Sequence, residues 1–537
     1  MNESPSGGDP WWRHAVIYQI YPLSFADSDG DGYGDIQGII SRLDYLSDTL
    51  GVDAVWLSPF FKSPMADWGY DVSDHTDVDP LFGDLDSAER LITEVHERGM
   101  RIIFDYVMNH TSIEHPWFVE SRSSRESAKR DWYVWRDAKP DGSPPTNWVS
   151  VFGGPAWTLD ETSGQYYRHT YLLEQPDLNW RNPDLVEAMM DVARFWLDRG
   201  VDGFRVDAAH QMMKDPLERD NPPAPEDYDR PWKDMAEYDE YVHLYDLGHP
   251  DVHGAHREFR AVLDTYPNDP LSVSEVHIFD LPEWASYYGD KLDELHMPFN
   301  FHLMAADWDA ASLRVAIESV HWNIPVGGWT NWTLGNHDEK RLATRLGLEN
   351  ARLAALLLLT LRGTPFIYYG DELGMADVHI PQGESKDPWG ESVPLLSRDG
   401  CRSPMQWDDT SNAGFGPEGS WLPVAPDYES RNVESELADP GSMLSLYRKI
   451  MAIRHQSSAL RMGSYLSHPS STDHVLVYRR ESDGDTMTVA LNLSDEFQEI
   501  PIRSGRVLIS TIDPDRAERF RERIVLGPRE GVLLGHI

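Results

Sequence analysis

Eight short β-rich runs alternate with helical segments along most of the chain, and this alternation constrains the fold more than any other feature. Each run is apolar at most positions, which is typical of a strand buried on both faces of a parallel sheet. One intervening helix can be delimited directly, because Asn182 and Pro183 open it, an apolar face follows, and Gly200 closes it. The pattern predicts an α/β fold, a closed (β/α)8 TIM barrel. Its strands are expected at Ala15 to Tyr21, Ala54 to Leu57, Arg101 to Val107, Gly203 to Asp207, Leu271 to Val276, Glu294 to Asn300, Asn331 to Asp338 and Phe366 to Glu372.

Two further regions do not fit the barrel repeat. The segment between the third and fourth strands is too long for one helix and is rich in Trp, Pro, Gly and Asn, which indicates an inserted subdomain. After about Arg461 the pattern changes to the alternating strands HVLVYRR, TMTVALNL, RVLIS and RIVLG, typical of an antiparallel β domain. We expect a barrel over 1–108 and 171–459, an inserted subdomain B over 109–170, and a C-terminal β-sandwich over 460–537.

Charge and cysteine content narrow the class of partner and the compartment. Lys and Arg total 47 and Asp and Glu total 90, so the formal net charge is −43, which repels nucleic acid and anionic membranes. Cys401 is the single cysteine, so no intrachain disulfide can form. The first residues do not resemble a signal peptide, and the longest apolar run, Leu353 to Leu361, is shorter than the ~18 residues of a membrane span. We expect a cytoplasmic monomer or homodimer with a small neutral substrate.

Acidic residues stand where several predicted strands end, namely Asp105, Asp207, Glu275 and Asp338. Strands buried on both faces give carboxylates little reason to occur there unless they are paired or functional. No Cys or His cluster at metal-ligand spacing accompanies them, so they indicate acid-base and covalent chemistry. Glycoside hydrolysis needs such a set. Arg205, two residues before Asp207 on the same strand face, is expected to keep that aspartate ionised.

Four ordered motifs around these residues resemble glycoside hydrolase family 13, the α-amylase superfamily, and within it the α-glucosidase and oligo-1,6-glucosidase group. The motifs are DYVMNH from Asp105, GFRVDAAH from Gly203, SEVH from Ser274 and GNHD from Gly335. The resemblance continues in GYDVSDH, QPDLNW and CRSPMQW and covers nearly the whole chain.

This resemblance implies a role for each matching residue. Asp207 would be the nucleophile, Glu275 the general acid and base, and Asp338 the transition-state stabiliser. An acid role predicts a raised pKa for Glu275. The pocket for the terminal glucose would be lined by Tyr70, Asp71, His110, Arg205, His337 and Arg402, with Phe152 as an aromatic wall.

The residue after the nucleophile, Ala208, bears on the linkage that is cleaved. In the family that the chain resembles, valine at this position accompanies α-1,6 cleavage, and smaller residues accompany α-1,4 cleavage. The resemblance therefore favours α-1,4 substrates.

An acidic loop, DSDGDGYGD, follows the first strand and begins like an EF-hand. Position twelve of an EF-hand loop would be Gly38, where a bidentate Glu is required, so an EF-hand is excluded. The resemblance instead implies one structural Ca²⁺ or Mg²⁺, and no organic cofactor is expected. Its ligands would be Asp27, Asp29, Asp31, Asp35 and the carbonyl of Tyr33.

The function expected from these observations is that of a retaining, exo-acting α-glucosidase on short α-glucosides, with transglucosylation as a side activity. The alternatives within this chemistry are an oligo-1,6-glucosidase and an isomerase or transglycosylase such as a trehalose synthase. A non-catalytic relative, such as the ectodomain partner of certain amino-acid transporters, would have broken catalytic positions, whereas the motifs here are intact.

Overall fold

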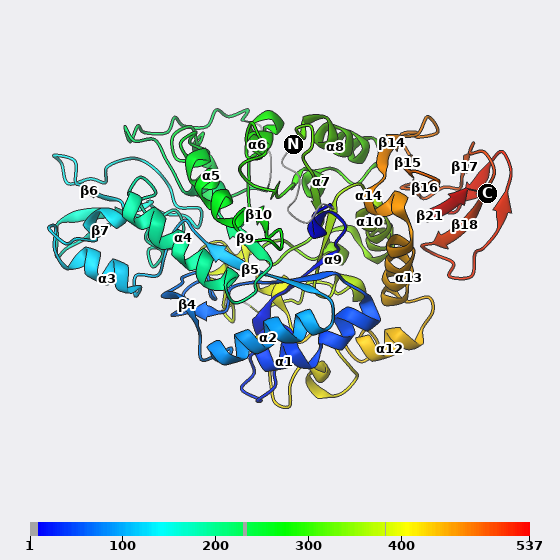
Figure 1. Ribbon diagram of the computed structural model, residues 1–537, viewed down its shortest axis with the longest axis horizontal. Coiled ribbons are helices and arrows are strands. Elements are labelled where there is room, and N and C mark those ends of the chain that lie inside the picture. The colour runs from blue at the N-terminus through cyan, green and yellow to red at the C-terminus, as the bar shows by residue number, and fades with distance from the viewer. Residues whose placement is uncertain (1–8, 229–232, 382, 537) are drawn as a thin grey trace.

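A computed structural model describes residues 9–228, 233–381 and 383–536. Eight parallel strands form one central sheet in the order β11-β10-β9-β5-β2-β1-β13-β12 (Figure 1). This is the predicted TIM barrel, with the strands in the predicted sequence order. Their bounds are β1 Ile17–Ile20, β2 Ala54–Leu57, β5 Arg101–Val107, β9 Gly203–Asp207, β10 Leu271–Ser274, β11 Met297–Pro298, β12 Asn331–Thr333 and β13 Thr364–Tyr368.

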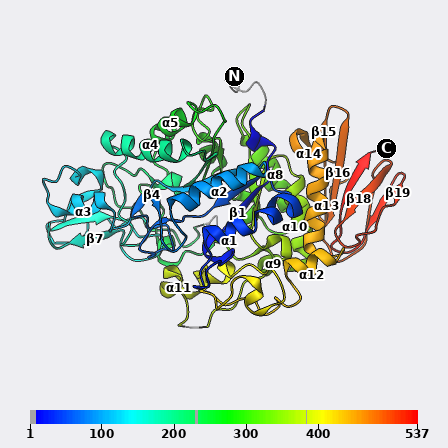
Figure 2. The ribbon, with the colours of Figure 1, turned by 60° about the horizontal axis from the view of Figure 1, so that its bottom comes forward.

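Each barrel strand is followed by a helix on the outside of the barrel, as Figure 2 shows for α1, α2, α4 and α5. Helix α4 begins as predicted, because the Asn182 side chain accepts hydrogen bonds from the backbone N–H groups of Asp184 and Leu185. In the described residues no helix is long and apolar enough to cross a bilayer. The eight helices are α1 Ile36–Ser41, α2 Leu85–Glu97, α4 Pro183–Leu197, α5 Val252–Leu263, α6 Leu281–Ser286, α8 Ala310–Asn323, α10 Leu348–Thr360 and α13 Met443–Gln456.

The barrel closes between β11 and β12 through a side chain. Among the described residues no backbone ladder joins these two strands. The Asn331 amide nitrogen donates to the Pro298 carbonyl at 2.9 Å, and its Oδ1 accepts from the Asn300 N–H at 3.1 Å. The strand predicted over Glu294 to Asn300 is reduced to β11. Pro298 has no N–H to donate to a neighbouring strand, so the ladder does not continue through it.

Two regions of antiparallel sheet lie at opposite ends of the molecule (Figure 1). The insertion after the third barrel strand carries α3 Pro116–Ser123 and a sheet of β6 Trp135–Asp137, β8 Gln165–Arg168 and β7 Trp157–Asp160. Smaller elements near the barrel are β3 Phe61–Lys62, β4 Asp74–Val78, α7 His302–Ala305, α9 Leu342–Leu346, α11 Pro388–Ser392, α12 Val433–Ala438 and α14 Ser458–Met462.

The C-terminal region contains a six-stranded and a two-stranded sheet that share one hydrophobic cluster. Ile500 and Ile524 of the small sheet pack against Val477 and Val532 of the large one in this cluster. The predicted C-terminal antiparallel β domain is thus confirmed. The strands of the large sheet are β14 Ser464–Ser467, β15 Val475–Ser482, β16 Asp485–Asn492, β18 Gly505–Ser510, β19 Arg519–Phe520 and β21 Gly531–His536, and those of the small sheet are β17 Gln498–Ile500 and β20 Ile524–Leu526.

Candidate active site

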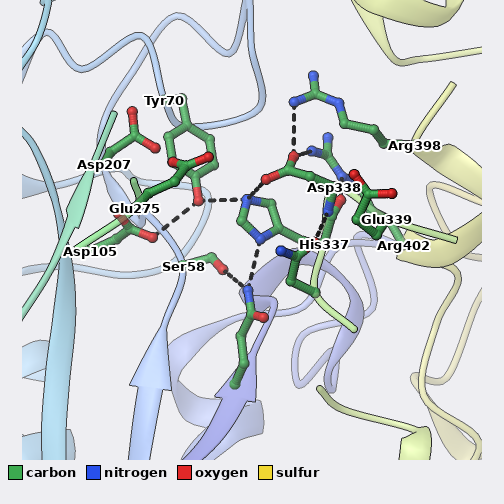
Figure 3. Close-up of polar contacts among 12 residues, drawn as sticks. Ser58, Tyr70, Asp105, Asp207, Glu275, His337, Asp338, Glu339, Arg398 and Arg402 are labelled. Carbon is green, nitrogen blue, oxygen red and sulfur yellow. Dashed lines mark hydrogen bonds and ion pairs between the residues drawn. The ribbon is translucent and has the colours of Figure 1, made fainter. Parts of the chain in front are cut away.

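Three carboxylates at the C-terminal end of the barrel line one cavity of about 370 Å³. Asp207 is the last residue of β9, Glu275 directly follows β10, and Asp338 lies in the loop after β12. Their positions at strand ends predicted this convergence, and Figure 3 shows it. Four of the residues expected to bind substrate also line the cavity: Tyr70, His110, Phe152 and His337.

Arg205 lies beneath the catalytic carboxylates and donates hydrogen bonds to two of them, Asp207 and Glu275, and also to Asp105. Its Nη1 donates to Asp207 Oδ1 at 2.7 Å and to Asp105 Oδ1 at 2.9 Å, and its Nη2 donates to Glu275 Oε2 at 2.8 Å. The Arg205 side chain is buried, and it lies on the same face of β9 as Asp207. Arg205 therefore positions the carboxylates from below, whereas it was expected to line the glucose pocket itself.

The pKa shifts of Asp207 and Glu275 have opposite directions. Burial raises the pKa of Asp207 well above its usual range. Burial also opposes ionisation of Glu275, but Arg205 and the hydrogen bond from His277 Nε2 at 2.7 Å outweigh it and hold the pKa of Glu275 well below its usual range. The predicted raised pKa of Glu275 is wrong for this arrangement, because the sequence does not reveal that Arg205 and His277 both reach this carboxylate.

Asp338 is held as an anion from two sides. Its Oδ1 accepts from Arg398 Nη1 at 3.1 Å and from Arg402 Nη2 at 3.2 Å, and its Oδ2 lies 3.2 Å from His337 Nε2. Although burial opposes ionisation, His337 and the two arginines lower the pKa of Asp338 well below its usual range. Arg402 also donates to the His337 carbonyl at 2.8 Å, so it supports the Asp338 loop from behind.

His110 and His337, two of the histidines that line the cavity, are neutral hydrogen-bonding groups. Burial lowers the pKa of His337 to about 3 and that of His110 to about 4. Gln19 Nε2, an obligatory donor, lies 2.8 Å from His337 Nδ1, so the proton of the ring is on Nε2, which is 2.7 Å from the Tyr70 hydroxyl. Tyr70 in turn donates to Asp105 Oδ2 at 3.0 Å (Figure 3).

An ion pair not expected from the sequence lines the cavity beside Asp338, and we refer to this part of the cavity as the closed end. Asp67 and Arg398 both line it, and Arg398 Nη2 donates to Asp67 Oδ1 at 2.7 Å. Arg398 also binds the buried Asp387 at 2.7 Å. The residues of this pair are 331 positions apart, so local sequence carries no signal for it.

Asp71, predicted to bind substrate, does not line the cavity. It is fully buried, and its two oxygens accept from the backbone N–H groups of Asp67 and Ala66, each at 2.9 Å, and from Ser63 Oγ. Asp71 therefore shapes the loop that presents Asp67. The assignment was made to the wrong aspartate of the segment Asp67 to Asp71, and Asp67 is the residue that faces the cavity.

Ala208 contributes its backbone to the site. Its N–H donates to Glu275 Oε2 at 3.2 Å, and its φ of 45° lies in the left-handed region. The Ala208 side chain is fully buried and does not line the cavity. Any influence of residue 208 on linkage is therefore indirect, through neighbours such as Glu275.

The acidic loop after β1 brings three carboxylates together. Single oxygens of Asp27, Asp29 and Asp35 lie within 4.8 Å of one another, a spacing that oxygen ligands around one Ca²⁺ adopt. Asp31 is not in this group, and its Oδ1 accepts from the Tyr33 N–H at 2.8 Å. The donor set, all carboxylate oxygens, fits a hard divalent cation.

Comparisons with known proteins agree with this geometry. Residues 19–463 match the family model described as alpha amylase, catalytic domain, and residues 468–533 match a domain of unknown function, DUF3459. The chain is 42% identical over 522 residues to a probable alpha-glucosidase of Rhizobium meliloti (strain 1021), covering 94% of each protein. It is 37% identical to an oligo-1,6-glucosidase of Parageobacillus thermoglucosidasius, covering 95% of this chain and 96% of that one. The crystal structure of an alpha-glucosyl transfer enzyme, XgtA, is similar with a TM-score of 0.91 at 40% identity and covers 99% of this chain and 100% of that one. The chain therefore belongs to the alpha-amylase family, glycoside hydrolase family 13, in its α-glucosidase and oligo-1,6-glucosidase group.

Proposed function

We propose that the protein is a retaining, exo-acting α-glucosidase that removes the terminal glucose of short α-glucosides. The observation that carries this proposal is the bridging of Asp207 and Glu275 by the single guanidinium of Arg205. Retaining glycosidases hold their two carboxyl groups about 5 Å apart, whereas inverting enzymes separate them further to admit a water. Two carboxylates on neighbouring nitrogens of one guanidinium fit the retaining geometry.

In the first step an oxygen of Asp207 attacks the anomeric carbon while Glu275 gives its proton to the departing glycosidic oxygen. This requires the proton to be on Glu275. A bound glucoside favours that state, because its electron-poor anomeric carbon beside Asp207 stabilises the ionised aspartate and its glycosidic oxygen accepts a hydrogen bond from the protonated glutamic acid. In the second step Glu275 takes a proton from water, whose oxygen bonds to the anomeric carbon as the ester to Asp207 breaks.

The closed end of the cavity supports exo action. The Asp67–Arg398 ion pair stands beside Asp338, where a longer sugar chain would have to continue. We assign the terminal glucose to this end, with Tyr70, His110 and His337 as partners of its hydroxyls and Phe152 as a wall against its ring. Asp338, with its charge fixed by two arginines, would stabilise the oxocarbenium-like transition state.

The expected α-1,4 preference remains part of the proposal, with oligo-1,6-glucosidase as its alternative. Trp389 and Arg398, both from the long loop before Cys401, line the cavity and provide a second place where linkage can be selected. Transglucosylation as a side activity is supported by the similarity of the chain to the alpha-glucosyl transfer enzyme XgtA.

The proposal includes one structural Ca²⁺ or Mg²⁺ held by Asp27, Asp29 and Asp35, with Asp31 and the Tyr33 carbonyl as further expected ligands. Such an ion would neutralise the clustered carboxylates and fix the loop that precedes α1. A cytoplasmic location and a monomeric or homodimeric state complete the proposal.

Anomer-resolved NMR tests the function. Maltose or isomaltose should release glucose first as the α-anomer, and Asp207→Asn should reduce turnover by several orders of magnitude while the protein stays folded. Asp191→Asn, the same substitution on the exposed face of α4, is the matched control. First appearance of the β-anomer, or near-normal turnover by the folded Asp207→Asn variant, would refute the proposed mechanism.

A further inference from the structure

The segment 233–247 lines the cavity and contacts two other parts of the molecule. At one end Lys233 Nζ contacts Glu339 Oε1 at 2.5 Å and the Asp338 carbonyl at 3.3 Å. Farther along, Glu237 Oε2 accepts from the Gly154 N–H of the inserted region at 2.9 Å. The segment is therefore tied both to the loop after β12 and to the loop that carries Phe152.

This segment lines the cavity mainly with apolar and aromatic side chains. The set, which we call the outer chamber, consists of Met235, Tyr238, Tyr241, Val242, Leu244, Leu247 and Phe279. Phe279 follows Glu275 along the chain, and Glu275 must face the leaving group in order to protonate it. We therefore place the outer chamber on the leaving-group side of the cavity.

Several polar side chains on this side of the cavity already have protein partners. His243 Nδ1 lies 3.0 Å from Asp246, and its Nε2 lies 2.8 Å from the Tyr238 carbonyl. Four more polar groups have partners of this kind: Lys233 with Glu339, His277 with Glu275, Gln211 with Lys214, and Asn336 with the N–H of Asp338. A second sugar ring would compete with these bonds for hydrogen-bonding groups, whereas an apolar ring needs none.

We propose that the outer chamber binds an aromatic or otherwise apolar aglycone, so that aryl and arylalkyl alcohols are preferred over a second sugar as leaving group and as acceptor. This inference rests on the proposed α-glucosidase function. Leu244, a cavity-lining side chain that is 59% exposed, would be covered by such a ring. Binding would bury apolar surface of both the aglycone and the outer chamber, and an aromatic aglycone would also pack against the tyrosine rings. These two contributions supply the affinity.

In the transfer reaction the oxygen of the alcohol forms a bond to the anomeric carbon as the ester bond to Asp207 breaks. Glu275 takes the proton of the alcohol hydroxyl, and Asp207 leaves as a carboxylate. The reaction is redox-neutral and needs no further reactant. The alcohol competes with water for the same glucosyl-enzyme, so the ratio of the two products reports binding in the outer chamber.

The experiment uses α-glucosyl fluoride as donor, because its leaving group does not occupy the outer chamber. Fluoride release counts total turnover, and free glucose counts hydrolysis. Equal concentrations of benzyl alcohol, methanol or methyl β-glucoside are offered as acceptors. We expect benzyl alcohol to be glucosylated about tenfold more efficiently than the other two, as burial of one ring permits. Normal fluoride release with no preference for benzyl alcohol would overturn the inference and leave the proposed function standing.

Two variants locate the preference in the outer chamber. Val242→Thr keeps the shape of the side chain but adds a hydroxyl, and it should lower the ratio of benzyl glucoside to glucose several-fold. Val315→Thr, the same change on the exposed side of α8, is the control and should not move the ratio. Met235→Gln repeats the test if Val242→Thr fails to fold. An unchanged ratio in the folded chamber variants refutes the inference, and absence of fluoride release from the wild type refutes the proposed function and the inference together.

Discussion

Replacement of Arg398 by methionine removes the cation that three carboxylates share. Arg398 donates to Asp67 and Asp387 at 2.7 Å and to Asp338 at 3.1 Å, and its own side chain is only 6% exposed. Methionine has a similar length but no charge, so Asp67 and Asp387 would remain as buried anions without this partner. Loss of one partner from a buried ion pair costs about 3–5 kcal/mol, and we expect Arg398→Met to lower the free energy of unfolding by this amount.

The same variant should change catalysis and its pH dependence. Arg398 helps to lower the pKa of Asp338, so its removal raises that pKa and makes Asp338 easier to protonate in acid. Since Arg402 still contacts Asp338, we expect kcat/KM to fall by about 10²- to 10³-fold, the usual effect of one lost transition-state donor. Arg398→Lys should restore little of the lost kcat/KM, because a compact ammonium cannot bridge three carboxylates.

The sign of the stability effect can also be checked against pH. The pKa of Asp387 is lowered in the folded protein, where Arg398 outweighs burial, so this pair stabilises the fold above the pKa of an unfolded Asp, about 4, and the stabilisation is lost as pH falls below it. The difference between wild type and Arg398→Met should therefore shrink in acid. Denaturant unfolding and pH–rate profiles on maltose measure both effects, with the exposed Arg523→Met as control. An Arg398→Met variant that matches this control in stability and in kcat/KM would refute the argument.

Three further outcomes are expected. Glu275→Gln should slow maltose hydrolysis far more than cleavage of α-glucosyl fluoride, whose departure needs little proton assistance; equal losses contradict the acid role. Chelation should lower Tm more than it lowers turnover at moderate temperature, because the acidic loop is separate from the cavity. An unchanged Tm, with no ion found by elemental analysis, would show that the loop is an acidic turn that binds no ion. Ala208→Val should lower the free energy of unfolding by about 1–3 kcal/mol, since φ is 45° at this residue. It should also shift the ratio of maltose to isomaltose turnover toward isomaltose. An unchanged ratio would assign linkage selection to the segment with Trp389.

The barrel and its carboxylates could be predicted because both depend on local pattern. Strands buried on both faces appear as continuous apolar runs, and an acidic residue at the end of such a run stands out. The family resemblance, and not the local pattern, located His110 and His337, since they lie within the matched motifs. It failed where two candidates share one segment: Asp67 and Asp71 are four residues apart, and only the folded loop turns one to the cavity and the other to its own backbone.

Long-range electrostatics could not be predicted. The low pKa of Glu275 depends on Arg205 and His277 reaching it from opposite sides, and the closed end of the cavity depends on Arg398 meeting Asp67. Neither contact follows from periodicity or composition. The apolar face that 233–247 turns to the cavity could not be predicted either, because it becomes visible only when the side chains of this segment are placed against the cavity.

The barrel is held together less firmly at Asn331 than elsewhere, so local opening should be easier there. Neighbouring strands elsewhere are held by ladders, whereas β11 and β12 share one side chain that donates once and accepts once. Fluctuations of the barrel should concentrate at this seam, and the amide of Asn300, protected only by that side chain, should exchange its hydrogen faster than amides within β5 or β9. The ends of β10 and β12, and with them the loops that carry Glu275 and Asp338, flank the seam. Breathing of the wall there would change the distance between acid and stabiliser without disturbing Asp207, which sits among the best-paired strands.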